Sequence, residues 1–297
     1  MRGIFDHSMS VGDAIEWGES FLDRSDELAA RSRADATLLL RHVLDIPPAE
    51  IYAYRERQLS LLELRTFQSL IDERVKGKPI QYITGEQEFF GLPFRVTPDV
   101  LIPRPETEHL VEAAIARLQN HSAPRIVDVG TGSGCIAVAL AHAMPHSEIV
   151  ALDISAAALA VAEQNARQNG VAERIGFLQS NLLAAVVGEG FDAVVSNPPY
   201  VALSERASLA TEVREFEPAL ALFAGPTGLE IYQRLIVEAN DLLASGGWLL
   251  MEIGHGQRDA VEKLLRGWEG VEFISDLQDI PRVAVARKGW GTANNPL

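Results

Sequence analysis

Residues 125–134 read RIVDVGTGSG, a buried-strand pattern that runs directly into a glycine-rich turn. An apolar helical run over residues 135–143 follows. Glycines let the backbone approach a ligand closely, and a helix that begins there presents unsatisfied N–H groups. The spacing is GxGxG, without the third glycine of GxGxxG or the GK[ST] ending of a P-loop. The stretch therefore predicts a strand, a turn and a helix, with either a ligand other than a dinucleotide or triphosphate at the turn or a purely structural turn.

Strand and helix patterns alternate through the second half of the chain. Candidate strands cover residues 125–129, 148–152, 175–178, 191–196, 247–253, 271–274 and 283–286. Candidate helices cover residues 106–118, 135–143, 156–168, 229–243 and 257–266. This alternation predicts an α/β fold with a parallel, doubly wound sheet, and the short gap before the last strand predicts an antiparallel hairpin at one edge.

The first part of the chain has a different pattern. Residues 1–76 predict a small helical bundle, a candidate substrate-docking domain, with Ser60 as the N-cap of its third helix. Residues 77–100, which include Ile80, Tyr82 and Ile83, are rich in β-type residues and predict a hairpin linker. We expect the catalytic domain over residues 101–288 and a loose tail over residues 289–297.

The candidate strand 191–196 ends in the run Ser196-Asn197-Pro198-Pro199-Tyr200. Prolines have no N–H, so this loop is stiff and presents carbonyl acceptors next to the Asn197 side-chain oxygen. Two convergent acceptors suit a planar NH2 group, and Tyr200 offers a flat apolar face to it. Held in this way, an amide or base nitrogen could be stabilised as positive charge develops on it. The alternative is an ordinary strand-ending turn.

Polar residues also follow the second and third candidate strands. Asp153, 19 residues beyond Gly134, can accept hydrogen bonds from both hydroxyls of a ribose, or can cap the next helix together with Ser155. Asn181 could read the edge of an adenine, and Leu182 could cover its face. The glycine turn, Asp153 and the adenine-edge residues together predict a site for an adenosine-containing ligand.

Composition limits the classes of function. The chain has 297 residues, a net charge of −15, one cysteine and no apolar run as long as a membrane span. The acidic charge counts against nonspecific binding to a phosphate backbone, and the single Cys135 excludes an intrachain disulfide framework. The expected location is the cytoplasm, with no membrane and no direct nucleic-acid partner.

Taken together, GTGSG, Asp153 and NPPY resemble the motifs of class I methyltransferases that use S-adenosylmethionine. The segments QYITGEQEFFG, LIPRPETE, VSNPPY, FEPALAL and IPRVAVA are similar to those of the peptide chain release factor N5-glutamine methyltransferase family, and the likeness spans almost the whole chain. The resemblance implies a seven-stranded catalytic sheet. It also implies methyl transfer from S-adenosylmethionine, with S-adenosylhomocysteine as product, to the glutamine amide in the GGQ motif of class 1 release factors.

The resemblance also implies roles for individual residues. The catalytic residues would be Asn197 and Pro198, whose oxygens hold the glutamine NH2, and Tyr200, which packs against the side chain; Pro199 completes the substrate site. No metal is expected. Asn181 and Leu182 stand where related sequences often have an acidic residue and an aromatic one. The implied cofactor-binding residues are Gly130, Thr131, Gly132, Ser133, Gly134, Asp153, Asn181, Leu182 and Asn197.

Other readings remain open from the sequence. The same NH2 site would serve a ribosomal-protein glutamine N5-methyltransferase or a nucleic-acid amino-methyltransferase, although no basic target-recognition domain is evident. A noncatalytic S-adenosylmethionine-binding protein is an alternative of another class. Cys135 reads as a core residue, His142 and His146 as surface residues, and Glu252 and His255 as residues that shape the pocket or a loop.

Overall fold

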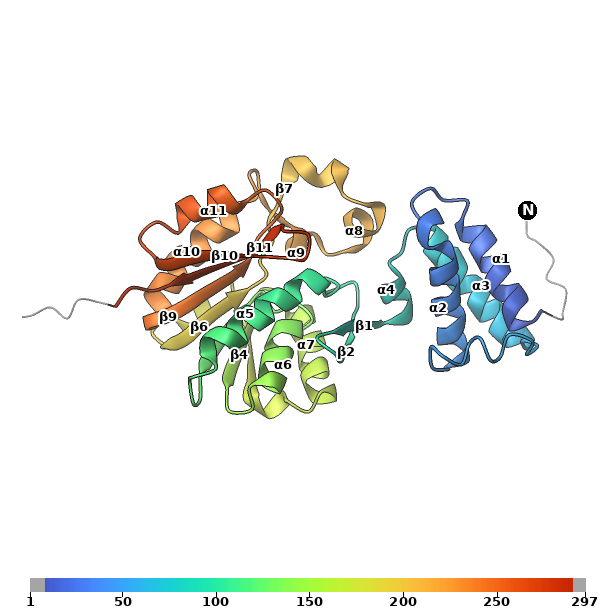
Figure 1. Ribbon diagram of the computed structural model, residues 1–297, viewed down its shortest axis with the longest axis horizontal. Helices are drawn as coiled ribbons and strands as arrows, with labels where there is room; N and C mark the ends of the chain where they lie inside the picture. Colours follow the sequence, from blue (N-terminus) through green and yellow to red (C-terminus); the bar gives the residue numbers. More distant parts are fainter. Residues whose placement is uncertain (1–8, 291–297) are drawn as a thin grey trace, which may run out of the picture. The chain divides into compact units, whose positions relative to one another are not determined.

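The computed structural model describes residues 9–290, which fold into two compact units (Figure 1). The helical unit contains the described residues up to Gly85 together with Thr211–Phe216. The sheet unit contains Glu86–Ala210 and the residues from Glu217 onward. Most of the tail expected over residues 289–297 lies outside the described residues. No helix within residues 9–290 is long and apolar enough to cross a membrane.

Serine caps start two of the three long helices in the helical unit. Ser10 accepts the N–H of Asp13 at 3.2 Å, and Ser60 accepts the N–H of Glu63 at 3.3 Å. Each acidic side chain accepts from the serine N–H in return, which completes a capping box and confirms the predicted Ser60 cap. The helices bury their apolar faces in one core around Phe67. The elements are α1 (Val11–Leu22), η1 (Ala29–Arg31), α2 (Ser32–Leu44), α3 (Leu61–Val75) and α4 (Ile80–Thr84).

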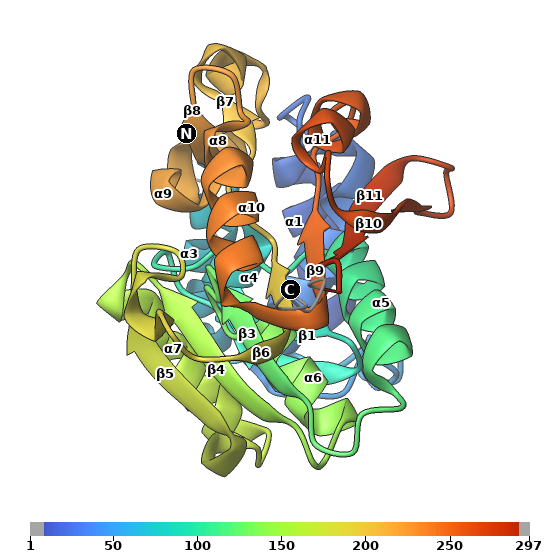
Figure 2. The ribbon, with the colours of Figure 1, turned by 90° about the vertical axis from the view of Figure 1, so that its left-hand side faces the viewer.

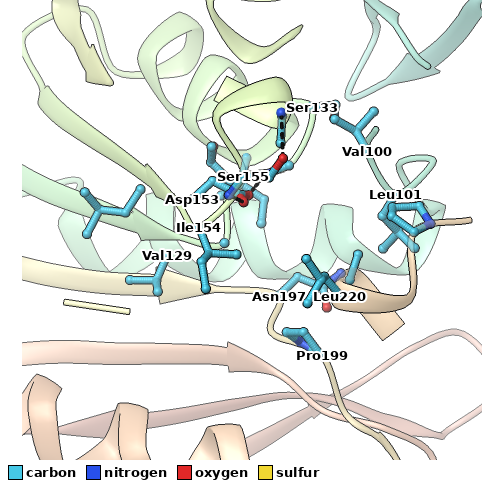
Figure 3. Close-up of a pocket in the computed structure, with 18 of the residues that line it drawn as sticks. Val100, Leu101, Val129, Ser133, Asp153, Ile154, Ser155, Asn197, Pro199 and Leu220 are labelled. Atoms are coloured by element: carbon cyan, nitrogen blue, oxygen red, sulfur yellow. Dashed lines mark hydrogen bonds between the residues drawn. The ribbon is translucent and has the colours of Figure 1, made fainter. Parts of the chain in front are cut away.

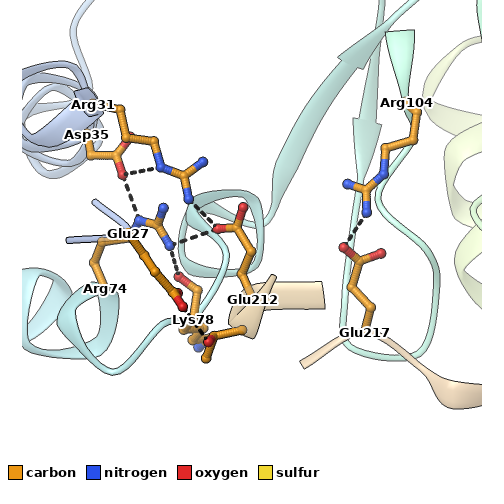
Figure 4. Close-up of polar contacts among 9 residues, drawn as sticks. Glu27, Arg31, Asp35, Arg74, Lys78, Arg104, Glu212 and Glu217 are labelled. Atoms are coloured by element: carbon orange, nitrogen blue, oxygen red, sulfur yellow. Dashed lines mark hydrogen bonds and ion pairs between the residues drawn. The ribbon is translucent and has the colours of Figure 1, made fainter. Parts of the chain in front are cut away.

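A buried arginine organises the polar interior of the helical unit (Figure 4). Arg74 is fully buried, and its Nε donates to Asp35 at 2.7 Å. Its Nη1 donates to Glu212 at 3.2 Å, and Arg31 donates to the same carboxylate at 2.6 Å. Glu212 lies on α8 (Thr211–Phe216), so a short segment from late in the chain is bound into this unit. Burial without a partner would be costly for Arg74, and the two carboxylates offset that cost.

The structure corrects one prediction of element type. Residues around Ile80 and Ile83, expected to be β-type, form the helix α4. Pro79 supplies the N-cap, and Gly85 ends the helix in the left-handed conformation with φ 79°. The Thr84 hydroxyl donates to the Ile80 carbonyl one turn earlier, so this side chain forms its hydrogen bond within the helix. The hairpin is therefore shorter than predicted and consists of β1 (Glu86–Phe89) and β2 (Leu92–Arg95).

The sheet unit is built on seven strands in the order β10-β11-β9-β6-β3-β4-β5 (Figure 2). The five strands from β9 to β5 are parallel. At the other edge, β11 pairs antiparallel with β9, and β10 pairs antiparallel with β11. The predicted doubly wound sheet and edge hairpin are confirmed. The strands are β3 (Arg125–Val129), β4 (Glu148–Asp153), β5 (Ile175–Gln179), β6 (Phe191–Ser196), β9 (Leu243–Glu252), β10 (Glu269–Ser275) and β11 (Pro281–Arg287).

Strand residues alternate between two cores, one on each face of the sheet. Ile126 and Leu250 join the core with α5 and α6, whereas Val127 and Leu249 join the core with α10 and α11. A period of two is what a sheet covered on both faces requires. The helices are η2 (Pro105–Thr107), α5 (Glu108–Leu118), α6 (Cys135–Ala143), α7 (Ala156–Gln168), η3 (Ala172–Arg174), η4 (Ala184–Val186), α10 (Glu230–Leu242) and α11 (Arg258–Leu264).

An insertion separates β6 from α10. It contains a small two-stranded parallel pair, β7 (Val201–Ala202) and β8 (Phe223–Gly225), with η5 (Leu203–Ser208) and α9 (Ala219–Leu222) between them. The α8 segment also lies in this insertion but belongs to the helical unit. The insertion follows directly after the NPPY run, so its residues are available to build a wall beside that run.

Candidate active site

Strand register brings the sequence motifs together at one edge of the sheet. Val129 at the end of β3 pairs with Leu152 of β4 and with Ser196 of β6, and Ser196 pairs with Met251 of β9. The Ser196 hydroxyl also donates to the Val129 carbonyl at 2.7 Å. The chain winds from β3 in one direction through β4 and β5, and in the other through β6 and β9. The motifs thus meet at the switch point, where α/β sheets bind ligands.

A cavity of about 320 Å³ opens at this edge (Figure 3), a size in the range of small-molecule sites. Figure 3 shows Asn197, Pro199 and Leu220 grouped together, with Ser133 and Asp153 on the side of the glycine turn. Gly134, Pro198 and Tyr200 are not among the residues that line the cavity. The sequence-predicted residues that do line it are Gly130, Thr131, Gly132, Ser133, Asp153, Asn181, Leu182, Asn197 and Pro199.

The three glycines of the turn have different surroundings. Gly130 and Gly132 have φ of 72° and 55°, and a Cβ atom at Gly130 would meet nothing within 4 Å. A Cβ atom at Gly134 would lie 3.0 Å from the Cβ of Ala162 on α7. The first two glycines therefore leave open space for a ligand beside the backbone, while Gly134 permits close packing of α7.

Asp153 lines the cavity and also binds two backbone N–H groups. One carboxylate oxygen accepts the Gly132 N–H at 2.9 Å, and the other accepts the Ser155 N–H at 2.9 Å. The helix cap itself is Ser155, which accepts the Ala158 N–H at 3.2 Å. Burial raises the pKa of Asp153, while its backbone hydrogen bonds oppose that shift. Each oxygen keeps a lone pair, so the carboxylate can still accept from ligand hydroxyls in the cavity.

Asn165 on α7 fixes the glycine turn from behind, a role that no sequence pattern indicated. Its side-chain NH2 donates to the Ser133 carbonyl at 2.8 Å and to the Arg95 carbonyl at 3.0 Å. Its oxygen accepts the Arg95 N–H at 2.8 Å. Asn165 is fully buried, so these bonds join the turn, α7 and the hairpin strand β2 without competition from water.

A chain of side-chain hydrogen bonds holds the Asn197 amide. Its Nδ2 lies 3.0 Å from Thr107 Oγ1, and that hydroxyl lies 2.5 Å from Glu252 Oε2. The Tyr200 hydroxyl donates to the other oxygen of Glu252 at 3.3 Å. Burial raises the pKa of Glu252 to about 7, against the lowering effect of the hydrogen bonds from Thr107 and Tyr200. One carboxylate thus contacts both ends of the network around the NPPY run.

Tyr200 packs in the wall of the sheet unit and does not face the cavity. Its ring contacts the core that contains α10 and α11, and its carbonyl accepts from Gln257 at 2.9 Å. Burial raises the pKa of its hydroxyl above the ordinary value, with the charge of Glu252 adding to the shift. The phenol is therefore a hydrogen-bond donor at neutral pH.

At the opposite end of the cavity, Arg234 of α10 controls the Asn181 side chain. Its Nη2 donates to Asn181 Oδ1 at 3.0 Å, which leaves the Asn181 NH2 as the free end of the amide. Leu182 has φ 52°, a left-handed conformation that is unusual for a side chain of this size. A free NH2 donor beside an apolar face suits the acceptor nitrogens of an adenine ring.

Several residues of the site were not assigned from the sequence. Thr107, Arg104 and Leu101 line the cavity from the segment LIPRPETE, and Arg104 donates to Glu217 at 2.5 Å (Figure 4). That segment was noted only as part of a resemblance. Leu220 lies in the segment FEPALAL, which was also noted only as part of that resemblance. Arg234 carries no local signal, because it reaches the site from α10.

Cys135 lies in the core and His142 and His146 lie on the surface, as the sequence predicted. Cys135 is buried, and burial raises the pKa of its thiol to about 12, so it is a thiol at neutral pH. His142 and His146 are exposed, and α6 ends at Ala143 between them. No group of three or more metal-binding side chains occurs in the part of the chain that the structure describes.

A glycine turn and an NPPY run at adjacent strand ends of this seven-stranded sheet define a class I methyltransferase. The family model described as methyltransferase small domain matches residues 108–216, and the PrmC N-terminal domain model matches residues 13–85. The solved hMettl16 catalytic domain is similar, with a TM-score of 0.54 and 19% identity over 66% of this chain and 76% of that chain. This likeness shows the fold alone.

Curated relatives identify the family. A release factor glutamine methyltransferase of Koribacter versatilis is 41% identical over 94% of this chain and 99% of its own length. A protein of the same name from Chlorobaculum tepidum is 45% identical over 84% of this chain and 88% of its own length. The chain belongs to the release factor glutamine methyltransferase family.

Proposed function

We propose that this protein transfers a methyl group from S-adenosylmethionine to the side-chain amide nitrogen of the glutamine in the GGQ motif of class 1 release factors, in the cytoplasm. The observation that carries the proposal is the register of β3 and β6, which aligns the glycine turn with Asn197 in a chain of this family. A ribosomal-protein glutamine or a nucleic-acid amine is the competing acceptor.

The residues present fit an adenosine-containing methyl donor. Gly130, Asp153 and Asn181 follow the neighbouring strands β3, β4 and β5, and all three line one cavity. The open space beside Gly130 suits a methionyl group, the Asp153 carboxylate suits a ribose, and the Asn181 NH2 suits an adenine. S-adenosylmethionine, when bound, supplies a sulfonium methyl group and leaves as S-adenosylhomocysteine.

The chain's own residues act on the acceptor. The Asn197 oxygen, at the cavity, accepts one hydrogen of the glutamine NH2 group. The carbonyl of the next residue, Pro198, which lies outside the cavity lining, accepts the other, and the two bonds orient the nitrogen for attack on the methyl carbon. As the nitrogen attacks, its lone pair leaves amide resonance and positive charge develops, and the two fixed acceptors stabilise that charge. The methylated nitrogen then releases one proton to water, which restores a neutral amide. Positioning and electrostatics supply the rate in this scheme, without a dedicated general base.

The test is methyl transfer from labelled S-adenosylmethionine to purified class 1 release factor, with intact ribosomes and nucleic acid as parallel acceptors. We expect label in the release factor only, and mass spectrometry should place one methyl group on the GGQ glutamine. Label in a ribosomal protein or in nucleic acid, with none in the release factor, would refute the proposed acceptor.

The variant that tests the role of Asn197 is Asn197→Ala. We expect single-turnover transfer to fall by about a hundredfold or more, because an acceptor aimed at developing charge is lost. S-adenosylmethionine affinity, measured by calorimetry, should fall far less than the rate of transfer. Undiminished transfer by this variant would exclude the acceptor role of Asn197.

A further inference from the structure

The Asn197 amide can bind the NH2 group of a methyl-accepting substrate in only one of its two orientations. Its oxygen must face the cavity, because an NH2 group there would oppose the hydrogens of the substrate. The two orientations fill almost the same volume, so shape does not select between them. The selection must come from the group that binds the other end of the amide.

That group is the Thr107 hydroxyl, 3.0 Å from Asn197 Nδ2 and 2.5 Å from Glu252 Oε2. An ionised carboxylate only accepts, so Thr107 must donate its one hydrogen to Glu252. The Thr107 oxygen can then only accept, and the end of Asn197 that faces it must be the NH2. The Asn197 oxygen is left on the side of the cavity.

We infer that Thr107 and Glu252 are positioning residues that hold the Asn197 amide in its acceptor orientation. The inference rests on the proposed function, since the orientation matters for a substrate that presents an NH2 group. Neither residue needs to contact the reacting atoms; each acts through Asn197. Thr107 and Glu252 are only 2% and 3% exposed, so water does not compete for these bonds.

The direction of hydrogen bonding depends on the charge of Glu252. If Oε2 carries a proton, Glu252 can donate to Thr107, and the Thr107 hydrogen becomes free to bind the Asn197 oxygen. The amide would then turn its NH2 toward the cavity. We call the hydrogen-bonded chain Glu252–Thr107–Asn197 the relay. The relay holds the Asn197 amide in its acceptor orientation only while Glu252 is ionised, so we expect the transfer rate to rise with pH.

Charged and titratable groups around Glu252 set where that rise occurs. Burial raises the pKa of Glu252 to about 7, the nearby Glu106 adds to the rise, and Arg282 opposes it. The hydroxyls of Tyr200 and Tyr232 also face this charge, and their raised pKa keeps them neutral here. The Cys135 thiol, with a pKa of about 12, is neutral as well. Among Glu252, the two tyrosines and Cys135, Glu252 is therefore the group that changes charge near neutral pH.

Paired variants separate the relay from a packing role. Thr107→Val keeps the shape but removes the hydroxyl, and we expect single-turnover transfer to release factor to fall by about tenfold to a hundredfold. Thr107→Ser keeps the hydroxyl and should transfer within about threefold of wild type. Transfer is measured at saturating S-adenosylmethionine, with the affinity of each variant determined by calorimetry, so that weaker cofactor binding is not read as slower transfer. Wild-type transfer by Thr107→Val, or equal loss in both variants, would overturn the relay.

Glu252→Gln gives a readout that a structural role would not move. The wild-type rate should rise with pH around pH 7, whereas the variant, which cannot ionise, should be insensitive to pH over about pH 6–8. An unchanged pH profile in Glu252→Gln would contradict the inference. This variant also carries the test should Thr107→Val fail to fold.

A measurement without turnover distinguishes failure of the relay from failure of the proposed function. In full-length protein with nitrogen-labelled asparagine, the side-chain NH2 signals of Asn197 can be assigned by their loss in Asn197→Ala. They should shift with pH around pH 7 in wild type and stay fixed in Glu252→Gln. Signals that shift with pH in a protein that methylates no release factor would refute the proposed function and support the relay. Transfer to release factor, with signals that do not shift with pH, would refute the relay alone.

Discussion

At the scale of single residues, Asp153 has structural bonds that can be separated from its proposed ligand role. Its oxygens hold the Gly132 and Ser155 N–H groups, and the same carboxylate lines the cavity. A charged acceptor contributes about 1.5–3 kcal/mol per hydrogen bond, so losing it affects both the turn and the ligand.

We therefore predict that Asp153→Ala weakens S-adenosylmethionine binding by about tenfold to a hundredfold in calorimetry. Asp153→Asn keeps one oxygen and should lose less affinity than Asp153→Ala. Ser60→Ala is the control, because it removes a helix cap in the helical unit, should cost about 1 kcal/mol of stability, and should leave the affinity unchanged. Lower stability without weaker binding in Asp153→Ala would assign this residue to the turn alone.

The sequence indicated some residues of the site better than others, for a physical reason. Asn197 and Asp153 follow strands directly, so a strand pattern is enough to place them at the edge of the sheet. Thr107 lies 90 positions from Asn197, and their contact depends on how η2 meets the end of β6. Tyr200 was expected to pack against the substrate, and its proposed role remains a prediction; the structure places its hydroxyl on Glu252.

At the scale of elements, the predicted strands and helices of the sheet unit were close to those observed. β3, β6, α6 and α7 have the predicted bounds, because apolar runs there are delimited by glycine, proline or capping residues. The error at α4 arose because isoleucine and tyrosine also suit strands, whereas Pro79 and Gly85 delimit a single helical turn. Local composition could not reveal that this turn packs against α2 and α3.

The attachment of the hairpin to α7 yields an element-scale prediction. Asn165→Ala would leave the Ser133 and Arg95 carbonyls and the Arg95 N–H without their buried partner, at a cost of about 2–4 kcal/mol in the free energy of unfolding. Asn169→Ala is the matched control on the same helix, because its partly exposed amide binds Pro93 of the same hairpin at 3.0 Å. We expect that variant to lose less than about 1 kcal/mol in urea denaturation. Similar losses of unfolding free energy in Asn165→Ala and Asn169→Ala would show that the buried hydrogen bonds of Asn165 add no stability.

At the scale of the whole molecule, we expect stability and activity to respond to pH in opposite directions, stability through two buried carboxyls and activity through Glu252 alone. Burial raises the pKa of both Asp128 and Glu252 to about 7, from ordinary values of 3.8 and 4.5. The folded protein therefore keeps protons that the unfolded chain has released. This contribution to stability is complete below the unfolded pKa values and is lost as pH rises through about 7.

We predict that the free energy of unfolding of the wild type falls between about pH 5 and about pH 7.5, by on the order of 3 kcal/mol per group. Carboxylates with lowered pKa, such as Asp276 bound by Arg282, act in the opposite sense only at more acidic pH. Urea denaturation at a series of pH values checks this, with Trp17→Phe as background so that the tryptophan signal comes from the sheet unit. Asp128→Asn and Glu252→Gln should each flatten the curve. Because the relay requires an ionised Glu252, the pH values that favour transfer should be those at which the sheet unit is less stable. A free energy of unfolding that rises with pH over this range would contradict both raised pKa values.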